Sequence, residues 1–242
     1  MRITCVTSRY LPNFRHLARL CEVDQAVVMD LAPLPDRNRD SFVNRNRIMN
    51  RGTAVPQWLT IPVLRSRGQS VRETRINLTD LRWPIGHINA LRLCYPQHQQ
   101  VAPGFVDGLS ASLEMSDGLL LRANLAALAH LMRSLQCHSK FPVLQSSLVE
   151  DHAEFHRLAV ATRLGASTYV AGSVEWELLT GSNEASLLRD AGIELVRSPD
   201  LPPEHFDSQL VTTLSCVHTI CGSGLDRGRS VLNDLSQFLN PE

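Results

Sequence analysis

The chain has 242 residues, 43% of them hydrophobic and 20% charged, which allows a substantial core and excludes a wholly disordered protein. Its formal net charge is zero, so the overall balance gives no reason to expect binding to nucleic acid. No apolar run is long enough for a membrane span, no signal peptide is visible, and the six cysteines form no Cys-x-x-Cys pair. We therefore expect a cytoplasmic protein with reduced thiols and no membrane segment.

The positive charge is carried almost entirely by arginine, because Lys140 is the single lysine. A phosphate-binding loop needs a Gly-x-x-x-x-Gly-Lys motif, which is missing. Schiff-base chemistry would depend on Lys140 alone, in a loop-like context. We set both mechanisms aside and expect no cofactor.

The first thirty residues predict an α/β fold. Residues 3–7 are a short apolar run, residues 14–21 carry apolar side chains at helical spacing, and residues 25–29 form a second apolar run that ends at Asp30. This order predicts a mixed or mostly parallel sheet flanked by helices, with Rossmann-like layering. Ligands of such folds bind beyond the carboxyl ends of strands, which directs attention to Ser8, Tyr10 and Asp30.

A stretch that begins at Asn44 combines carboxamides and guanidiniums. In an extended chain Asn44 and Asn46 would point one way, and Arg45 and Arg47 the other. A guanidinium binds carboxylate or phosphate through two parallel hydrogen bonds, and a carboxamide both donates and accepts. The stretch is a candidate site for an anionic or hydroxyl-rich ligand, and a solvated basic edge strand is the alternative interpretation.

The residues around this stretch predict a loop and a hairpin. Residues 31–42 contain two prolines and are expected to form a loop that can act as a lid. Residues 58–63 have the composition of a buried strand, and we expect them to pair with residues 71–76.

Residues 80–95 predict a helix with Pro84 in an early turn. Trp83 and His87 are four residues apart and therefore share one face. Because histidine titrates near neutral pH, His87 is a candidate general base. A structural role is the alternative for a lone helix histidine.

The second half alternates predicted helices and strands, which indicates further α/β units. The most periodic segment is a helix over 116–136. The predicted strands are 141–144, 167–171 and 193–197, and the other predicted helices are 105–112, 151–164, 176–180, 185–191 and 229–239. We see no internal repeat and expect a single domain over 1–242, with two lobes (about 1–112 and 113–242) as an option.

Two groups of potential metal ligands lack the pattern of a zinc site. Cys216, His218 and Cys221 lie within six residues, but a structural zinc needs a fourth ligand. His152 and His156 have a metal-binding helical spacing, but no glutamate follows the first of them directly. We therefore expect no metal.

Small residues follow two apolar segments, at Gly172-Ser173 and at 222–224. Such turns let a ligand approach backbone amides, and they also serve as plain turns. Neither forms the Gly-x-Ser-x-Gly motif of an α/β-hydrolase.

These features occur together in a pattern that resembles the WbqC-like family. The most specific parts are Asn-Arg-Asn-Arg-Ile at 44–48 and Trp-Leu-Thr-Ile-Pro-Val at 58–63. The other matching positions span nearly the whole chain: Tyr10-Leu11-Pro12, Asp30, Trp83, His87, Tyr95, Ser146-Ser147, Leu164-Gly165-Ala166, Tyr169, Gly172 and Gly222.

Members of that family are associated with bacterial O-antigen and other polysaccharide gene clusters and with natural-product clusters. The resemblance therefore implies a biosynthetic enzyme of transferase type. Thr7, Ser8, Asn13 and Gly86 depart from the family pattern. These departures imply a divergent member with a changed substrate or altered chemistry.

We predict an enzyme that transfers an acyl or aminoacyl group to an amine of a sugar or small metabolite. Its predicted site consists of Tyr10, Asn44, Arg45, Asn46, Arg47 and Trp83 for substrate binding, with His87 or Asp30 as the proton acceptor. A cofactor-independent tailoring enzyme (cyclisation, condensation or elimination) and a non-catalytic anion-binding protein are the alternatives. The expected partner is a small anionic or amine-bearing molecule, and a homodimer is an open option.

Overall fold

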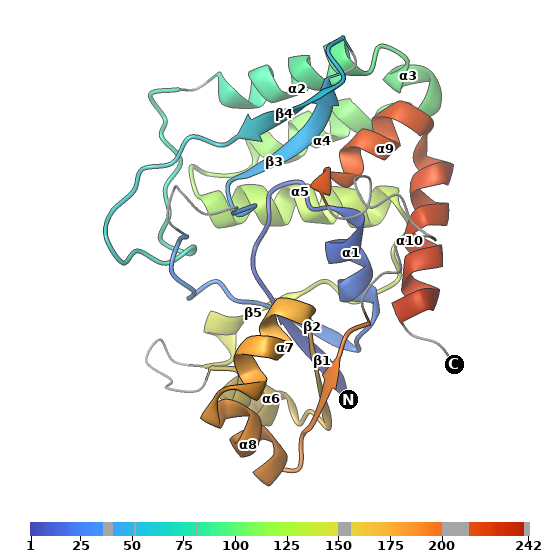
Figure 1. The fold of residues 1–242 in the computed structure, drawn as a ribbon. Helices are drawn as coiled ribbons and strands as arrows, with labels where there is room; N and C mark the ends of the chain where they lie inside the picture. The colour runs from blue at the N-terminus through green and yellow to red at the C-terminus, as the bar shows by residue number, and fades with distance from the viewer. Residues whose placement is uncertain (36–40, 51, 81, 150–155, 200–212, 240–242) are drawn as a thin grey trace.

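A five-stranded sheet forms the centre of the structure (Figure 1). The structure is a computed structural model, and it describes residues 1–35, 41–50, 52–80, 82–149, 156–199 and 213–239. Neighbouring strands are parallel and follow the order β5-β2-β1-β6-β7. The strands are β1 (Arg2–Val6), β2 (Gln25–Val28), β5 (Val143–Leu144), β6 (Thr168–Ala171) and β7 (Glu194–Arg197). The chain winds outwards from β1 in both directions, which confirms the predicted α/β fold class.

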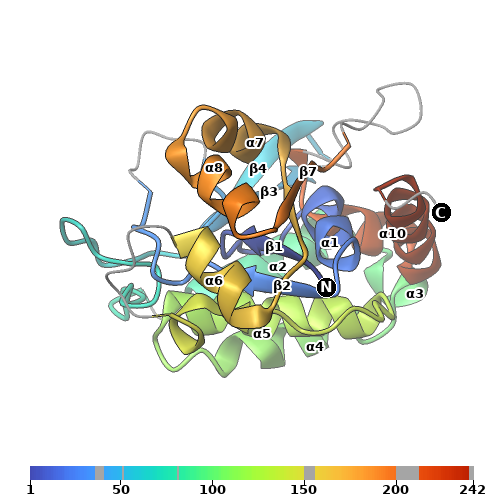
Figure 2. The ribbon, with the colours of Figure 1, turned by 90° about the horizontal axis from the view of Figure 1, so that it is seen from below.

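Helices cover both faces of this sheet (Figure 2). Alternate strand residues point to opposite faces, so Val6, Val28 and Val170 join one apolar cluster while Ile3 and Val27 join another. The helices that contribute to the first cluster include α1 (Phe14–Cys21), α5 (Leu120–Ser134) and α10 (Leu225–Leu239), and those of the second are α6 (His156–Leu164), α7 (Ser173–Thr180) and α8 (Asn183–Asp190).

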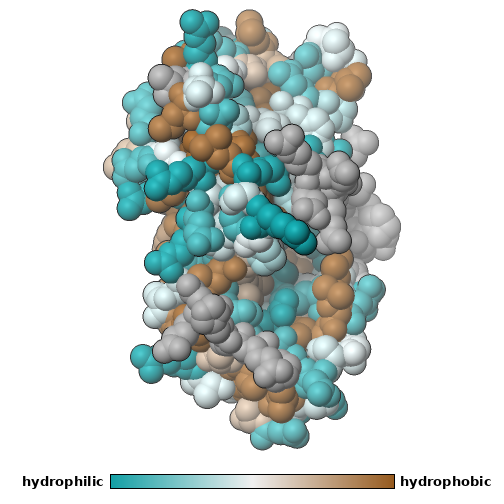
Figure 3. All heavy atoms as spheres, turned by 90° about the vertical axis from the view of Figure 1, so that its left-hand side faces the viewer, coloured by the Kyte–Doolittle hydropathy of each residue, from teal (hydrophilic) through white to brown (hydrophobic). Residues whose placement is uncertain are grey.

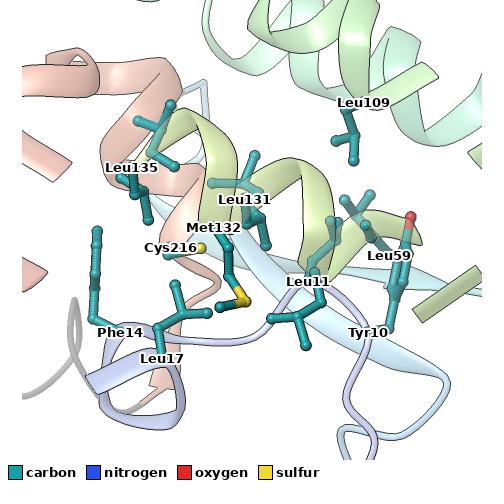
Figure 4. Packing of buried hydrophobic residues seen from close by; sticks show 14 of the residues in the cluster. Tyr10, Leu11, Phe14, Leu17, Leu59, Leu109, Leu131, Met132, Leu135 and Cys216 are labelled. Carbon is teal, nitrogen blue, oxygen red and sulfur yellow. The ribbon is translucent and has the colours of Figure 1, made fainter. Parts of the chain in front are cut away.

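The first helix is fixed by a cap and by packing. Asn13 Oδ1 accepts a hydrogen bond from the His16 backbone N–H at 2.9 Å, so α1 begins at Phe14. Phe14 and Leu17 then point toward the end of α5 (Figure 4). Burying a side chain of this size contributes about 1.5–3 kcal/mol, so packing rather than helix propensity holds this short helix.

A second, two-stranded sheet contains β3 (Arg45–Asn50) and β4 (Val55–Thr60), which pair antiparallel. The predicted pairing of 58–63 with 71–76 is therefore wrong. A short connection joins β3 to β4, whereas Pro62, which has no N–H to donate, interrupts the ladder on the other side. One isolated bridge, between Val63 and Ile76, joins the two segments.

The other helices are α2 (Trp83–Cys94), α3 (His98–Val101), α4 (Phe105–Glu114), the 3-10 turn η1 (Gln145–Ser147) and α9 (Cys216–Ser223). The long predicted helix starts at Leu120 rather than at 116, because Gly118 has a left-handed φ of 72°. The small residues at 222–223 continue α9 until Gly224 (φ 98°) instead of breaking the chain. Residues 151–155 of the predicted helix over 151–164, and part of the predicted lid loop, lie outside the described residues.

No helix in the described ranges has both the length and the apolar character needed to cross a bilayer.

A buried aromatic group connects α2 to the loop after β1. Tyr10 Oη and His87 Nδ1 are 2.9 Å apart, and the Trp83 ring lies edge-on to both rings. All three side chains are buried. Burial lowers the pKa of His87 to about 4, so its imidazole is neutral near pH 7.

His87 makes stability depend on pH. Its folded-state pKa lies below the ordinary value of 6.5, so the unfolded chain takes up a proton first and stability falls as the pH drops from about 6.5 towards 4. His87→Gln keeps a hydrogen-bonding partner for Tyr10 but does not titrate. We expect its loss of unfolding free energy between pH 7 and pH 5 to be smaller than that of the wild type by about 2 kcal/mol.

Urea unfolding at the two pH values measures this difference. His138→Gln, at an exposed histidine, is the control and should keep the wild-type pH dependence. Equal pH dependence in wild type and His87→Gln would contradict the assignment.

A thiol pair lies at the end of α1. Cys21 Sγ and Cys137 Sγ are 2.9 Å apart, and Ser139 Oγ is 3.0 Å from Cys137 Sγ. The hydrogen bond from Cys21 lowers the pKa of Cys137 to about 6, while the same contact raises the pKa of Cys21.

Cys137 should therefore be the more reactive thiol, because the thiolate is the nucleophile. At pH 7 we expect iodoacetamide to modify Cys137 at least about tenfold faster than Cys5, whose pKa burial raises to about 12. Peptide mass spectrometry after timed quenching gives both rates. Modification of Cys5 before Cys137 would refute the prediction.

Candidate functional site

A cavity of about 410 Å³ opens at the carboxyl ends of β1 and β6, where the winding of the sheet reverses direction. This topological switch point is where open α/β sheets bind ligands. The lining residues come from strands, helices and the loops at their ends: Cys5, Val6, Thr7, Arg9, Arg15, His16, Arg19, Met29, Arg157, Gly172, Ser173, Val174, Glu175, Leu178, Ser198 and Leu239. Four guanidiniums and one carboxylate thus surround one space.

Arg19 fixes α1 to this switch point. Its Nη2 lies 2.8 Å from Thr4 Oγ1, 3.2 Å from the Val170 carbonyl oxygen and 2.8 Å from Glu175 Oε2. These acceptors belong to β1, β6 and α7. One side chain therefore connects the helix to both strands and to the helix that follows the second strand.

Glu175 is the carboxylate of the cavity, and its charge is already shared. Besides Arg19, it accepts hydrogen bonds at Oε1 from Arg157 Nε (2.8 Å) and from the Tyr169 hydroxyl (2.6 Å). Burial alone would raise the pKa of Glu175, but Arg19, Tyr169 and Arg157 hold it below its ordinary value. Glu175 therefore stays ionised and neutralises part of the charge of Arg19 and Arg157.

Gly172 provides the room that this network needs. A Cβ at this position would lie 2.5 Å from Arg19 Nη1, so a larger residue would displace the guanidinium. The next residue, Ser173, begins α7, and its hydroxyl is 3.3 Å from Arg15 Nη2. The positive dipole end of the α7 N-terminus favours an anion here.

Arg9 differs from the other arginines of the cavity. Within the described part of the chain its guanidinium has no hydrogen-bond or carboxylate partner. Its Cζ lies over the Phe42 ring, 5.6 Å from the ring centroid. Burial, Arg19 and Arg15 lower the pKa of Arg9 to about 10. The group remains cationic at neutral pH, and a bound anion would relieve the repulsion.

His16 and Cys5 are the two lining side chains whose protonation decides what chemistry the cavity supports. His16 is buried, and burial together with Arg9 and Arg19 lowers its pKa well below 6.5, so the ring is neutral. Among the described residues none hydrogen-bonds to this ring. Burial raises the pKa of Cys5 to about 12, so Cys5 is a thiol rather than a thiolate nucleophile.

The structure gives the two asparagines of the 44–47 stretch backbone partners. Asn44 Nδ2 donates to the Ile61 carbonyl at 3.0 Å. Asn46 Nδ2 lies 2.6 Å from the Leu11 carbonyl and 3.2 Å from that of Tyr10, and it supports Leu11 at a left-handed φ of 42°. Both asparagines are buried. They were predicted to orient a substrate, and in the structure their side chains hold neighbouring loops in place.

Arg45 and Arg47 lie on the opposite face of β3, as the alternation of an extended strand predicts. Both stack on Trp58, with Cζ 4.4 Å and 4.9 Å from its centroid. They do not line the cavity. Phe42, which contacts both Arg47 and Arg9, lies between the two regions.

The other predicted site residues also lie outside the cavity lining. Tyr10, Trp83 and His87 come together in the buried group described above. Asp30 is fully buried at the end of β2, and its two carboxylate oxygens accept hydrogen bonds from the Ser146 N–H (3.0 Å) and hydroxyl (2.6 Å). The catalytic roles of His87 and Asp30 remain predictions, and both groups already have protein partners.

Sequence reasoning did not select Arg9, Arg15, His16, Arg19 or Arg157. A signal for part of this set exists, because Arg15 and Arg19 are four residues apart on the helix that follows the first strand. Arg157 comes from a distant segment and carries no local signal.

No group of three or more histidines, cysteines or acidic residues in the described ranges is placed to hold a metal ion. Cys216 and Cys221 are buried in α9, and His218 Nδ1 lies 2.7 Å from the Tyr95 hydroxyl. The two cysteines therefore pack in the core, and His218 pairs with Tyr95.

Comparison with known proteins gives two findings and one absence. The protein Rv1507c of Mycobacterium tuberculosis (strain ATCC 25618 / H37Rv), described as uncharacterized, is 28% identical over 203 residues, which cover 82% of this chain and 72% of its own. No solved structure shows a significant match. Residues 7–197, which carry most of the cavity lining and the β3–β4 hairpin, match the model of the WbqC-like protein family.

The chain therefore belongs to the WbqC-like protein family.

Proposed function

We propose that this protein is a biosynthetic transferase that binds an anionic acyl or aminoacyl donor in the switch-point cavity and transfers the group to the amine of a sugar or small metabolite. One observation carries the proposal: Arg9 lines the cavity with no carboxylate partner among the described residues, whereas Arg19 and Arg157 are already paired with Glu175 and Glu184. Such a surplus of fixed positive charge favours a ligand with negative charge.

The arginines would act on the leaving group. In acyl transfer the amine nitrogen bonds to the acyl carbon, and the bond from that carbon to the leaving group breaks with its electron pair. An anionic leaving group is stabilised by cations already in place, because they need no reorganisation during the reaction. Arg9 and Arg15, with the start of α7, are positioned for this role.

His16 would take the proton that the amine loses. Its ring is neutral and has no hydrogen-bond partner among the described residues. An anion bound beside Arg9 would offset the positive charge that, with burial, lowers the pKa of His16, and the ring could then accept a proton. This availability favours an enzyme over the non-catalytic alternative, in which a binding pocket needs no free base.

One face of the molecule has mixed polarity. On the face shown in Figure 3, hydrophobic residues form small groups among hydrophilic ones. A continuous apolar patch, as expected for a protein interface, is not seen on that face.

The first test replaces Arg9 by methionine, which keeps contact with Phe42 and removes the charge. We expect the affinity for inorganic phosphate, measured by isothermal titration calorimetry, to fall about tenfold or more, because a charge-assisted hydrogen bond contributes roughly 1.5–3 kcal/mol. In the absence of anion the thermal midpoint should rise, since the repulsion among Arg9, Arg15 and Arg19 is relieved.

Arg227→Met, at an exposed arginine of α10, is the matched control and should leave both quantities unchanged. Equal phosphate affinity in wild type and Arg9→Met would exclude the cavity as the anion site.

The second test separates an enzyme from a binding protein. With acetyl phosphate as donor and glucosamine as acceptor, we expect wild type to form the N-acetyl product above the uncatalysed rate, detected by mass spectrometry. His16→Gln should lower this rate at least about a hundredfold while phosphate affinity stays within about twofold. Phosphate binding without turnover would support the non-catalytic alternative.

A further inference from the structure

Arg9 belongs to a second cluster as well as to the cavity. Its Cζ is 5.6 Å from the centroid of Phe42, and Arg47 Cζ is 5.7 Å from the same centroid. Arg47 also stacks on Trp58, whose ring centroid is 6.0 Å from that of Phe42. Guanidiniums and aromatic rings therefore alternate from the cavity to the β3–β4 hairpin.

The Arg47 guanidinium lacks a counter-charge in the part of the chain that the structure describes. Its Nε is buried without a hydrogen-bond partner, and within the described ranges no carboxylate pairs with its guanidinium. Arg45, by comparison, donates from Nε to the Ser41 carbonyl at 3.3 Å. A half-buried guanidinium without an anion is costly, which points to a partner that arrives from solution.

Hydrogen bonds fix the backbone that carries the Arg47 side chain. The Arg47 carbonyl accepts a hydrogen bond from the Ser215 N–H at 2.8 Å, and its N–H donates to Asn46 Oδ1 at 2.7 Å. Phe42 is connected to the loop after β1, because its carbonyl accepts a hydrogen bond from the Tyr10 N–H at 2.9 Å. The cluster is therefore preorganised by both regions.

Stacking also orients the donors. An aromatic ring contacts the flat face of a guanidinium and leaves the N–H groups at its edge available. Those edge groups match the oxygens of a phosphate through paired hydrogen bonds. Arg9 and Arg47, both on Phe42, can therefore each offer donors to a phosphate group without losing their aromatic contact.

We propose that the region around Phe42 and Arg47 is an outer subsite for a second phosphate, so that the ligand is a diphosphate compound with one phosphate in the cavity and the other between Arg9 and Arg47. This inference rests on the proposed function of the cavity. It deepens that proposal by giving the donor two linked anionic groups.

Calorimetric titrations with inorganic phosphate, pyrophosphate and succinate test the subsite. For wild type we expect pyrophosphate to bind at least about tenfold more tightly than phosphate, and succinate to bind more weakly than pyrophosphate. Arg47→Met should reduce pyrophosphate affinity to near that of phosphate and leave phosphate affinity within about twofold. Arg9→Met should weaken both ligands, and Arg227→Met neither.

The possible failures point to different conclusions. Unchanged pyrophosphate affinity in Arg47→Met, with phosphate still bound, would overturn the outer subsite and leave the cavity assignment standing. Tighter binding of succinate than of pyrophosphate would overturn the phosphate chemistry. Failure of wild type to bind phosphate or pyrophosphate would overturn both proposals. Far-ultraviolet circular dichroism and the thermal midpoint of each variant show whether it is folded like the wild type, so that a loss of affinity can be distinguished from unfolding.

Discussion

The structure depends on the guanidinium of Arg19, which lies at the switch point between the carboxyl ends of β1 and β6. Arg19 reaches from α1 across the ends of β1 and β6 and hydrogen-bonds to both strands and to Glu175. A partly buried charge of this kind depends on its partners, so the Thr4 hydroxyl, the Val170 carbonyl and the Glu175 carboxylate act together. Gly172 follows from the same requirement, because any side chain there would occupy the place of the guanidinium.

This arrangement separates two kinds of arginine around one cavity. Arg19 and Arg157 share Glu175 and hold the fold together, whereas Arg9 has no such counter-charge within the described residues. The distinction matters for function, because a guanidinium that is already paired contributes little to binding. The α/β sheet supplies the position and the paired arginines supply rigidity, so Arg9 is left to recognise the ligand.

The strands of the main sheet could be predicted because each is a short apolar run bounded by turn residues, and the alternation of Asn and Arg in 44–47 correctly predicted opposite faces. The pairing partner of β4 could not be predicted, because local composition does not distinguish β3 from residues 71–76 as the neighbouring strand. The site was harder still. Asn46 looked like a ligand-binding carboxamide, but its partners are the carbonyls of Tyr10 and Leu11, which only tertiary structure brings near. The cavity likewise joins Arg9 to Arg157, which no spacing rule connects.

The environment of Arg9 also favours arginine over lysine at this position. Its surroundings lower the pKa from 12.5 to about 10, which still leaves the guanidinium fully protonated in a cell. A lysine starts from about 10.4, so the same surroundings would lower its pKa towards neutrality and leave part of the population uncharged. Replacing arginine by lysine here would therefore turn a permanent charge into one that varies with the acidity of the medium.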